Sequence, residues 1–208
     1  MKSPKSWRQV TLKQFINLQA LPETTNDVTK LINQVAVLTK YTPEDIREMN
    51  SKKLNKIGDR LKFLETLPKE RNTKNFYHKR RYYKRADLDH TTVAQVTEIL
   101  TLNADEKNIG KKILNALAVI YYSGKKVDYD SDRYKDTLNK LENLDFTTAL
   151  NSTSFFLRGL TTYLPDALAR FSRKLTPGQR EKLTDAVENI EKVNALNVYK
   201  RYTSGTTF

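Results

Sequence analysis

Residues 71–88 read RNTKNFYHKRRYYKRADL, a stretch that interleaves seven cations with four aromatic rings. It contains no acidic residue before Asp87, so its positive charges repel one another and oppose its burial in a core of its own. This repulsion, together with Pro68 just upstream, disfavours a helix and predicts an extended arm or an irregular hairpin. No Asn-Gly type of turn indicates a tight hairpin. The cations are Arg71, Lys74, Lys79, Arg80, Arg81, Lys84 and Arg85, and the rings belong to Phe76, Tyr77, Tyr82 and Tyr83.

Two interpretations of this arm stay open. It is either a solvated basic linker or a contact arm for nucleic acid or for an acidic protein surface. Cations contact phosphates and tyrosine rings offer their faces to bases, but no recognition-helix or RNP-type motif accompanies the arm. The candidate contact residues in the arm are Arg71, Lys74, Tyr77, Lys79, Arg80, Arg81, Tyr82, Tyr83, Lys84 and Arg85.

The segment before the arm, residues 1–67, has helical periodicity. Thr11 and Gln14 have the spacing of a capping box, which predicts a helix that begins at Leu12. Apolar residues at helical spacing over residues 28–38 predict a second helix.

A further helical pattern follows Thr42-Pro43, where a cap residue precedes a proline at the first helical position. An apolar stripe over residues 54–64 continues this pattern at the spacing of a packed helix. Residues 1–67 therefore predict three to four helices in an N-terminal helical unit.

The helical pattern recurs after the arm at offsets of 81, 82 and 84 residues. The same order and nearly constant spacing of three matches indicate a duplicated helical unit. The alternative is that two unrelated helical bundles share T-x-x-Q caps and Leu/Ile stripes. The matched pairs are TLKQFINL at 11–18 with TVAQVTEI at 92–99, LINQVAVL at 31–38 with ILNALAVI at 113–120, and LNKI at 54–57 with LNKL at 138–141.

Residues 145–208 extend the second unit. Thr176-Pro177-Gly178-Gln179 combines a cap residue, a first-turn proline and a capping-box glutamine, so a C-terminal helix should begin there. The last ten residues lose periodicity but carry three aromatic rings, which suits either a docking tail or a frayed terminus. The candidate contact residues in this tail are Tyr199, Arg201, Tyr202 and Phe208.

The expected fold is all-α, with two related helical units joined by a basic extended arm or irregular hairpin and with extra C-terminal helices. The domains are an N-terminal helical unit at 1–67, the basic aromatic arm at 68–91, and a second helical unit with C-terminal helices and tail at 92–208. A chain of 208 residues can bury a core as one domain or as two small ones.

Composition limits the classes of function. The net charge is +13, about half of it from the arm, which favours anionic partners. No apolar run approaches the roughly 18 residues of a membrane span, and the polar start MKSPKSWRQV lacks the apolar core of a secretory signal, so we expect the chain to stay where it is made. The absence of cysteine excludes disulfides, a thiol nucleophile and a cysteine zinc site.

Catalytic and metal-binding motifs are missing from the sequence. It has no Gly-rich phosphate loop, no G-x-S-x-G elbow and no H-E-x-x-H helix, and neither His78 nor His90 has a visible catalytic partner. DYDSD at 128–132 has the first spacings of a calcium loop but then places Arg133 where glycine is needed and Asn139 where glutamate is needed. We therefore expect no catalytic residues, no metal and no cofactor.

The pattern W-x-x-V-T-L-x-Q-F at Trp7 to Phe15, the helices behind it, the basic aromatic segment and a second T-x-x-Q opening at Thr92 resemble a family of small helical proteins. This family comprises neck, ring, connector or tail-assembly proteins of tailed bacteriophages, including crAss-like phages. The resemblance covers residues 7–165. The chain departs from it at Val96, where a longer aromatic is expected, and over residues 176–208.

The resemblance implies a non-enzymatic virion protein near the portal or tail, made in the host cytoplasm and present as a homo-oligomer, or a tail-assembly chaperone that the particle does not retain. Its implied partners are portal, ring or tail components, with DNA contact left open and no membrane contact. Two classes of function follow: a structural protein whose arm and tail clasp neighbouring subunits, and a non-specific nucleic-acid-binding helical protein.

Overall fold

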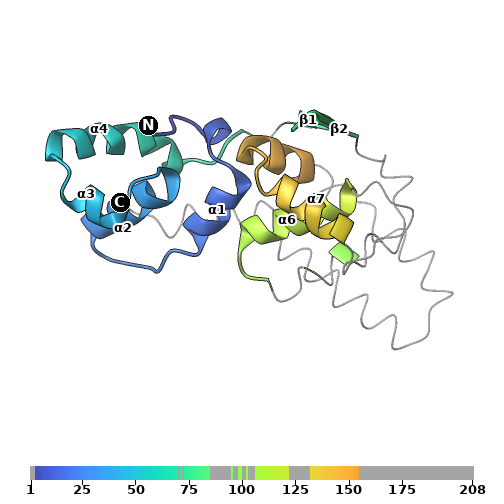
Figure 1. Ribbon diagram of the computed structural model, residues 1–208, viewed down its shortest axis with the longest axis horizontal. Coiled ribbons are helices and arrows are strands. Elements are labelled where there is room, and N and C mark those ends of the chain that lie inside the picture. The colour runs from blue at the N-terminus through green and yellow to red at the C-terminus, as the bar shows by residue number, and fades with distance from the viewer. Residues whose placement is uncertain are drawn as a thin grey trace.

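The computed structural model describes residues 3–69, 71, 73–84, 95, 98–99, 102, 106–121 and 132–154 (Figure 1). This part of the chain is mainly helical and contains one two-stranded sheet, in agreement with the helical class predicted from sequence. The elements in chain order are η1 (Trp7–Gln9), α1 (Leu12–Gln19), α2 (Asp27–Leu38), α3 (Pro43–Arg47), α4 (Ser51–Leu61), η2 (Lys62–Glu65), β1 (Asn75–His78), β2 (Arg81–Lys84), α6 (Ile109–Ile120) and α7 (Asp132–Leu141).

Polar caps determine where the helices begin. The capping box predicted at Thr11 is confirmed, because the Gln14 amide donates to the Thr11 hydroxyl at 3.2 Å and the Thr11 amide donates to Gln14 Oε1 at 2.9 Å. A second capping box joins Thr42 and Asp45 at the start of α3. Each such cap contributes about 1 kcal/mol to helix stability. The caps of α2, α4 and α6 are Asn26, Asn50 and Asn108.

α2 and α6 correspond in position and length. Each has 12 residues, and both ends of α6 lie 82 residues after the ends of α2, at 27 to 109 and at 38 to 120. Each also starts from an asparagine cap whose side chain accepts the amide three residues on. The matched tetrapeptides at 54–57 and 138–141 lie on α4 and α7. Most of 92–99 lies outside the described residues.

α1 lies between the two groups of helices. It packs against α2 on one side and against α6 on the other, so the helices at the two ends of the view in Figure 1 are joined through it. The buried residues from both sides of α1 form one hydrophobic cluster.

Main-chain hydrogen bonds fasten the start of α1 to the segment after α7. The amide of Leu12 donates to the carbonyl of Leu144, and the amide of Phe146 donates to the carbonyl of Val10, both at 2.8 Å. Thr11 and Asp145 form an antiparallel bridge between these bonds. Two segments more than 130 residues apart in the chain are therefore held together by their backbones.

Four aromatic rings fill the space beside this junction. Trp7 lies 4.9 Å from Phe146 and 5.3 Å from Phe63 between ring centroids, and Phe15 stacks on Phe146 at 3.9 Å. Trp7 Nε1 also donates to the carbonyl of Thr66 at 2.6 Å. Aromatic pairs contribute about 0.5–1.5 kcal/mol each beyond the area that they bury, so this cluster holds the chain firmly just before the arm begins.

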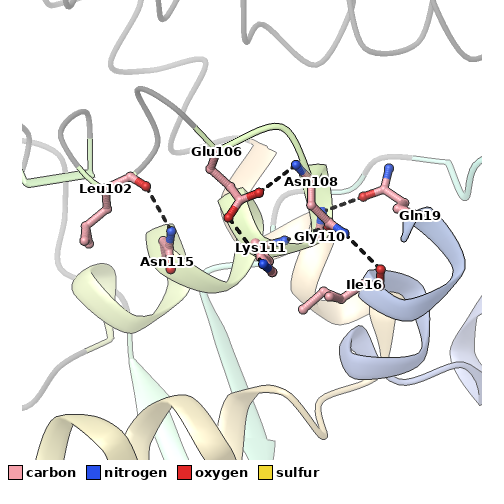
Figure 2. A network of polar contacts seen from close by, with 8 residues as sticks. All are labelled: Ile16, Gln19, Leu102, Glu106, Asn108, Gly110, Lys111 and Asn115. Carbon is pink, nitrogen blue, oxygen red and sulfur yellow. Dashed lines mark hydrogen bonds and ion pairs between the residues drawn. The ribbon is translucent and has the colours of Figure 1, made fainter. Parts of the chain in front are cut away.

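A polar network joins the end of α1 to the start of α6 (Figure 2). Asn108 caps α6 through its Oδ1 atom and donates from Nδ2 to the carbonyl of Ile16 at 2.9 Å, and the amide of Gly110 donates to Gln19 Oε1 at 2.8 Å. A Cβ atom at Gly110 would lie 2.6 Å from Ile16 Cγ1, so only glycine allows this close approach. One asparagine thus serves both helices.

Candidate partner-binding hairpin

The basic aromatic stretch forms a regular hairpin. β1 and β2 pair antiparallel with Asn75 opposite Lys84 and His78 opposite Arg81, which leaves a two-residue turn. Both turn residues, Lys79 and Arg80, have positive φ angles, 47° and 64°. This is the backbone of a type I′ turn, whose twist matches that of paired strands.

The prediction of an extended segment instead of a helix is confirmed, whereas the prediction that a hairpin here would be irregular is wrong. Type I′ turns favour Asn and Gly, and a residue with a Cβ atom pays roughly 1–2 kcal/mol for the left-handed conformation. Lys79 and Arg80 adopt it because the flanking strands are held in place by contacts from elsewhere in the fold.

Strand alternation divides the hairpin into two faces. The inner face consists of Phe76, His78, Arg81 and Tyr83, and the outward face of Asn75, Tyr77, Tyr82 and Lys84. On the inner face Phe76 is buried and stacks on Tyr83, with ring centroids 4.9 Å apart and planes at 12°. Tyr121, at the end of α6, meets the edge of Phe76 at 4.9 Å.

The expectation that charge repulsion keeps the whole stretch out of the core is therefore wrong. Alternation sends Phe76 and Tyr83 to the core and leaves the neighbouring cations exposed, so the rings are buried without any charge being buried with them. Tyr83, a candidate contact residue, is half-buried on the inner face.

Hydrogen bonds fix the hairpin at three places. His78 Nε2 donates to the carbonyl of Lys140 in α7 at 2.9 Å, and the hydroxyl of Tyr121 donates to the carbonyl of Lys74 at 3.3 Å. The amide of Arg71 donates to Asn151 Oδ1 at 2.8 Å. Asn151 belongs to the helical segment 146–154, beside which the hairpin lies in Figure 1. The hairpin is thus a docked element of the fold.

The outward face presents two aromatic rings to solvent. Tyr77 is 77% exposed and Tyr82 is 52% exposed, and their ring centroids lie 4.9 Å apart with the planes tilted by 44°. Among the described residues, the only other large hydrophobic side chain that is exposed is Val28. Two exposed neighbouring rings on a fixed strand pair are the feature that a binding partner would use.

The six cations of the arm that the structure describes are all exposed. Within the described residues, none of Lys79, Arg80, Arg81 and Lys84 forms an ion pair. Asp136 in α7 pairs with Lys140; this hydrogen bond, together with the charges of Lys140, Arg81 and Lys79, lowers the pKa of Asp136. The hairpin therefore has a strongly positive exterior. The exposed cations are Arg71, Lys74, Lys79, Arg80, Arg81 and Lys84.

Burial changes the titration of two inner-face groups. It is the main cause of a lowered pKa at His78, to which the charge of Lys79 adds, while the hydrogen bond to Lys140 opposes it. Burial also raises the pKa of Tyr83.

Several candidate residues lie outside the part of the chain that the structure describes. These include Arg85 and the whole tail, and the DYDSD motif is covered only at its last residue. The described residues contain no cluster of His, Asp and Glu suited to a metal ion, and no described helix is long and apolar enough to cross a membrane. The tail candidates concerned are Tyr199, Arg201, Tyr202 and Phe208.

The residues that hold the hairpin against the core were not predicted from the sequence. Phe76 was visible as one more ring among four, but the residues that receive it, Tyr121 and the backbone of Lys140, carry no local sign of this contact. In NFYH and RYYK the rings stand next to each other, so the sequence lacks the alternation of apolar and polar residues that would have marked the inner rings.

Comparison of the chain with protein-family models, with curated proteins and with solved structures gave no match.

Proposed function

We propose that the protein is a non-enzymatic assembly protein that binds an anionic partner through the outward face of the hairpin. The observation that carries this proposal is the division of the hairpin: one face is docked on the core, while the other presents two exposed tyrosines beside Lys84, with the exposed cations of the turn at one end. A solvated linker would not require one face of the hairpin to be packed on the core, so the docked face favours a binding role.

Docking of the hairpin on the core reduces the entropic cost of binding a partner. A free arm must lose backbone and side-chain freedom when it meets a partner, but here the backbone is already held by the hydrogen bonds of His78 and Tyr121. Tyrosine and arginine are the residue types that most often provide binding energy in interfaces, because a rigid ring buries area at small entropic cost. The unpaired cations add attraction at long range.

We propose a tailed-phage particle as the setting, with the protein retained as a homo-oligomer near the portal or tail. The resemblance at Trp7 to Phe15 supports this setting, and the exposed basic face suits a protein that meets an acidic neighbour during assembly.

We also propose that residues 1–67 and 92–150 are related helical units separated by the arm at 68–91. The equal lengths of α2 and α6, their shared offset of 82 residues and their asparagine caps support this relationship. In both helices the same three positions are buried, which are Ile32, Val35 and Leu38 in α2 and Leu114, Leu117 and Ile120 in α6.

Two variants with equal net charge test the binding role. One is Arg80→Gln/Arg81→Gln/Lys84→Gln in the hairpin, and the matched control, Lys40→Gln/Lys52→Gln/Lys56→Gln, removes three exposed cations elsewhere. On immobilised heparin, used as a polyanion, the hairpin variant should elute at clearly lower salt than the control, because local charge density governs polyanion binding. Elution of both variants at the same salt would contradict the proposal.

The setting is tested by mass spectrometry of purified particles. The control variant should be incorporated like the unaltered protein, and the hairpin variant should be depleted. Absence of the unaltered protein from mature particles would replace the structural role with that of a chaperone.

A further inference from the structure

We infer that the anionic partner is a single-stranded nucleic acid whose bases stack on Tyr77 and Tyr82. This inference rests on the proposed function and adds the chemical class of the partner. The two ring pairs of the hairpin differ in geometry. The inner pair, Phe76 and Tyr83, is nearly parallel at 12°, so each ring uses a face on the other. The outward pair is tilted by 44°, and it keeps ring faces available to a ligand.

The surroundings of the two outward rings are polar and cationic. Anchor residues in protein interfaces lie in well-packed apolar pockets from which water is excluded. Tyr77 and Tyr82 instead have Asn75 and Lys84 as neighbours on the outward face, and both of these side chains are exposed. Exposed rings among polar and cationic groups match the sites where single strands bind, because every base offers a flat face and every nucleotide a phosphate.

Cations lie on both sides of the ring pair along the hairpin. Lys79 and Arg80 form the turn at one end of the ring pair, and Lys84 stands beyond the rings at the other end. At roughly 3.4 Å per residue, the strand from Arg80 to Lys84 spans about 14 Å, a length that a few nucleotides cover. Tyr77 and Tyr82 lie directly opposite each other between these two groups of cations, so phosphates on either side of the stacked bases would each meet a cation.

A duplex does not fit this arrangement equally well. Its bases are stacked on one another, so ring faces on the protein gain nothing from them unless the strands separate. An acidic protein would satisfy the cations, but its carboxylates offer no aromatic face that could stack on the two rings. The geometry thus favours unpaired bases over both alternatives.

The test measures fluorescence anisotropy of labelled oligonucleotides of about 16 nucleotides, oligodeoxyuridine and oligouridine, against a duplex of equal length and polyglutamate. The probe variant is Tyr77→Thr/Tyr82→Thr, since threonine keeps strand propensity. The matched control is Tyr77→Phe/Tyr82→Phe, which keeps both rings. Thermal melting confirms that each variant is folded, and both substituted side chains are exposed in the structure.

The unaltered protein should bind the single strands at least about tenfold more tightly than the duplex. The threonine variant should lose about tenfold or more in affinity for single strands, while the phenylalanine variant should stay within about twofold. The affinity should also fall as salt rises, with a slope of roughly −2 to −3 if three or four phosphates are contacted at about −0.7 each. Similar results with both single strands would indicate recognition of bases irrespective of the sugar, and a difference would identify DNA or RNA as the partner; either supports the inference.

Two results would overturn it: equal or tighter binding of the duplex or of polyglutamate, and single-strand affinity that is unchanged in the threonine variant. In either case heparin elution separates this failure from failure of the proposed function. Loss of heparin binding in the hairpin glutamine variant would leave an anionic partner of another class, whereas unchanged heparin binding would remove both proposals.

Discussion

The two faces of the hairpin contain similar residues and have opposite environments. Phe76 and Tyr77 are adjacent in sequence, yet Phe76 is buried against Tyr83 and Tyr121 while Tyr77 is 77% exposed. On the second strand the contrast is smaller, because Tyr83 is half-buried and Tyr82 is 52% exposed. By residue type alone, the four rings of the hairpin form one aromatic group. The period of two in a strand separates them into a structural pair and a pair that is free to meet a partner.

The largest effect should come from removing the inner ring. Phe76→Ala deletes a buried aromatic side chain and its stacking on Tyr83, so we expect a loss of about 3 kcal/mol in the free energy of unfolding. Tyr77→Ala, its neighbour on the other face, should change stability by less than about 1 kcal/mol. Urea denaturation measures both. Equal losses would show that the two faces are not distinct.

A smaller effect is expected at the turn. Lys79→Asn/Arg80→Gly places the preferred type I′ residues where positive φ angles already exist, so stability should rise by about 1 kcal/mol or more. Heparin binding should weaken at the same time, because two cations of the positive exterior are lost. A stabilised variant with weaker binding would separate the structural and binding contributions of the hairpin. A destabilised variant would count against the positive-φ turn.

The smallest effect concerns pH. Because burial lowers the pKa of His78 below its usual 6.5, the unfolded chain binds more protons there than the folded protein does. The part of the stability that depends on neutral His78 is therefore fully present above about pH 6.5, and it is lost as the pH falls through the lowered pKa of His78 in the folded protein.

Melting temperatures at about pH 7.5 and about pH 5.5 measure this contribution. The unaltered protein should lose more stability between the two values than His78→Gln, in which no titrating group is left at this position. Identical pH dependence in the two proteins would mean that His78 is not desolvated by docking.

The parts of the fold that sequence predicts are those with local causes. The helix at Leu12 follows from a capping box within four residues, and the stripe over 28–38 follows from periodicity within one segment. The docking of the hairpin has no local cause. It depends on Tyr121 and on the carbonyl of Lys140, which lie far along the chain from Phe76, and the turn residues carry a weak signal because Lys and Arg are unusual at positive φ.

The candidate site divides in the same way. The cations and rings were identifiable by residue type, since charge and aromaticity are properties of single side chains. Which rings face the partner was not identifiable until the register of β1 and β2 was known, because a shift of one residue would exchange Tyr77 for Phe76 on the outward face.

The backbone junction between Val10 and Phe146 also has a consequence for the order of folding. During synthesis the segment in front of α1 can form these main-chain hydrogen bonds only after Phe146 has left the ribosome. Until then, part of the core formed by the first helices stays uncovered. The chain's single tryptophan, Trp7, lies against Phe146 at this junction. Its fluorescence should therefore report the late step in which the beginning of the chain closes onto a segment made much later.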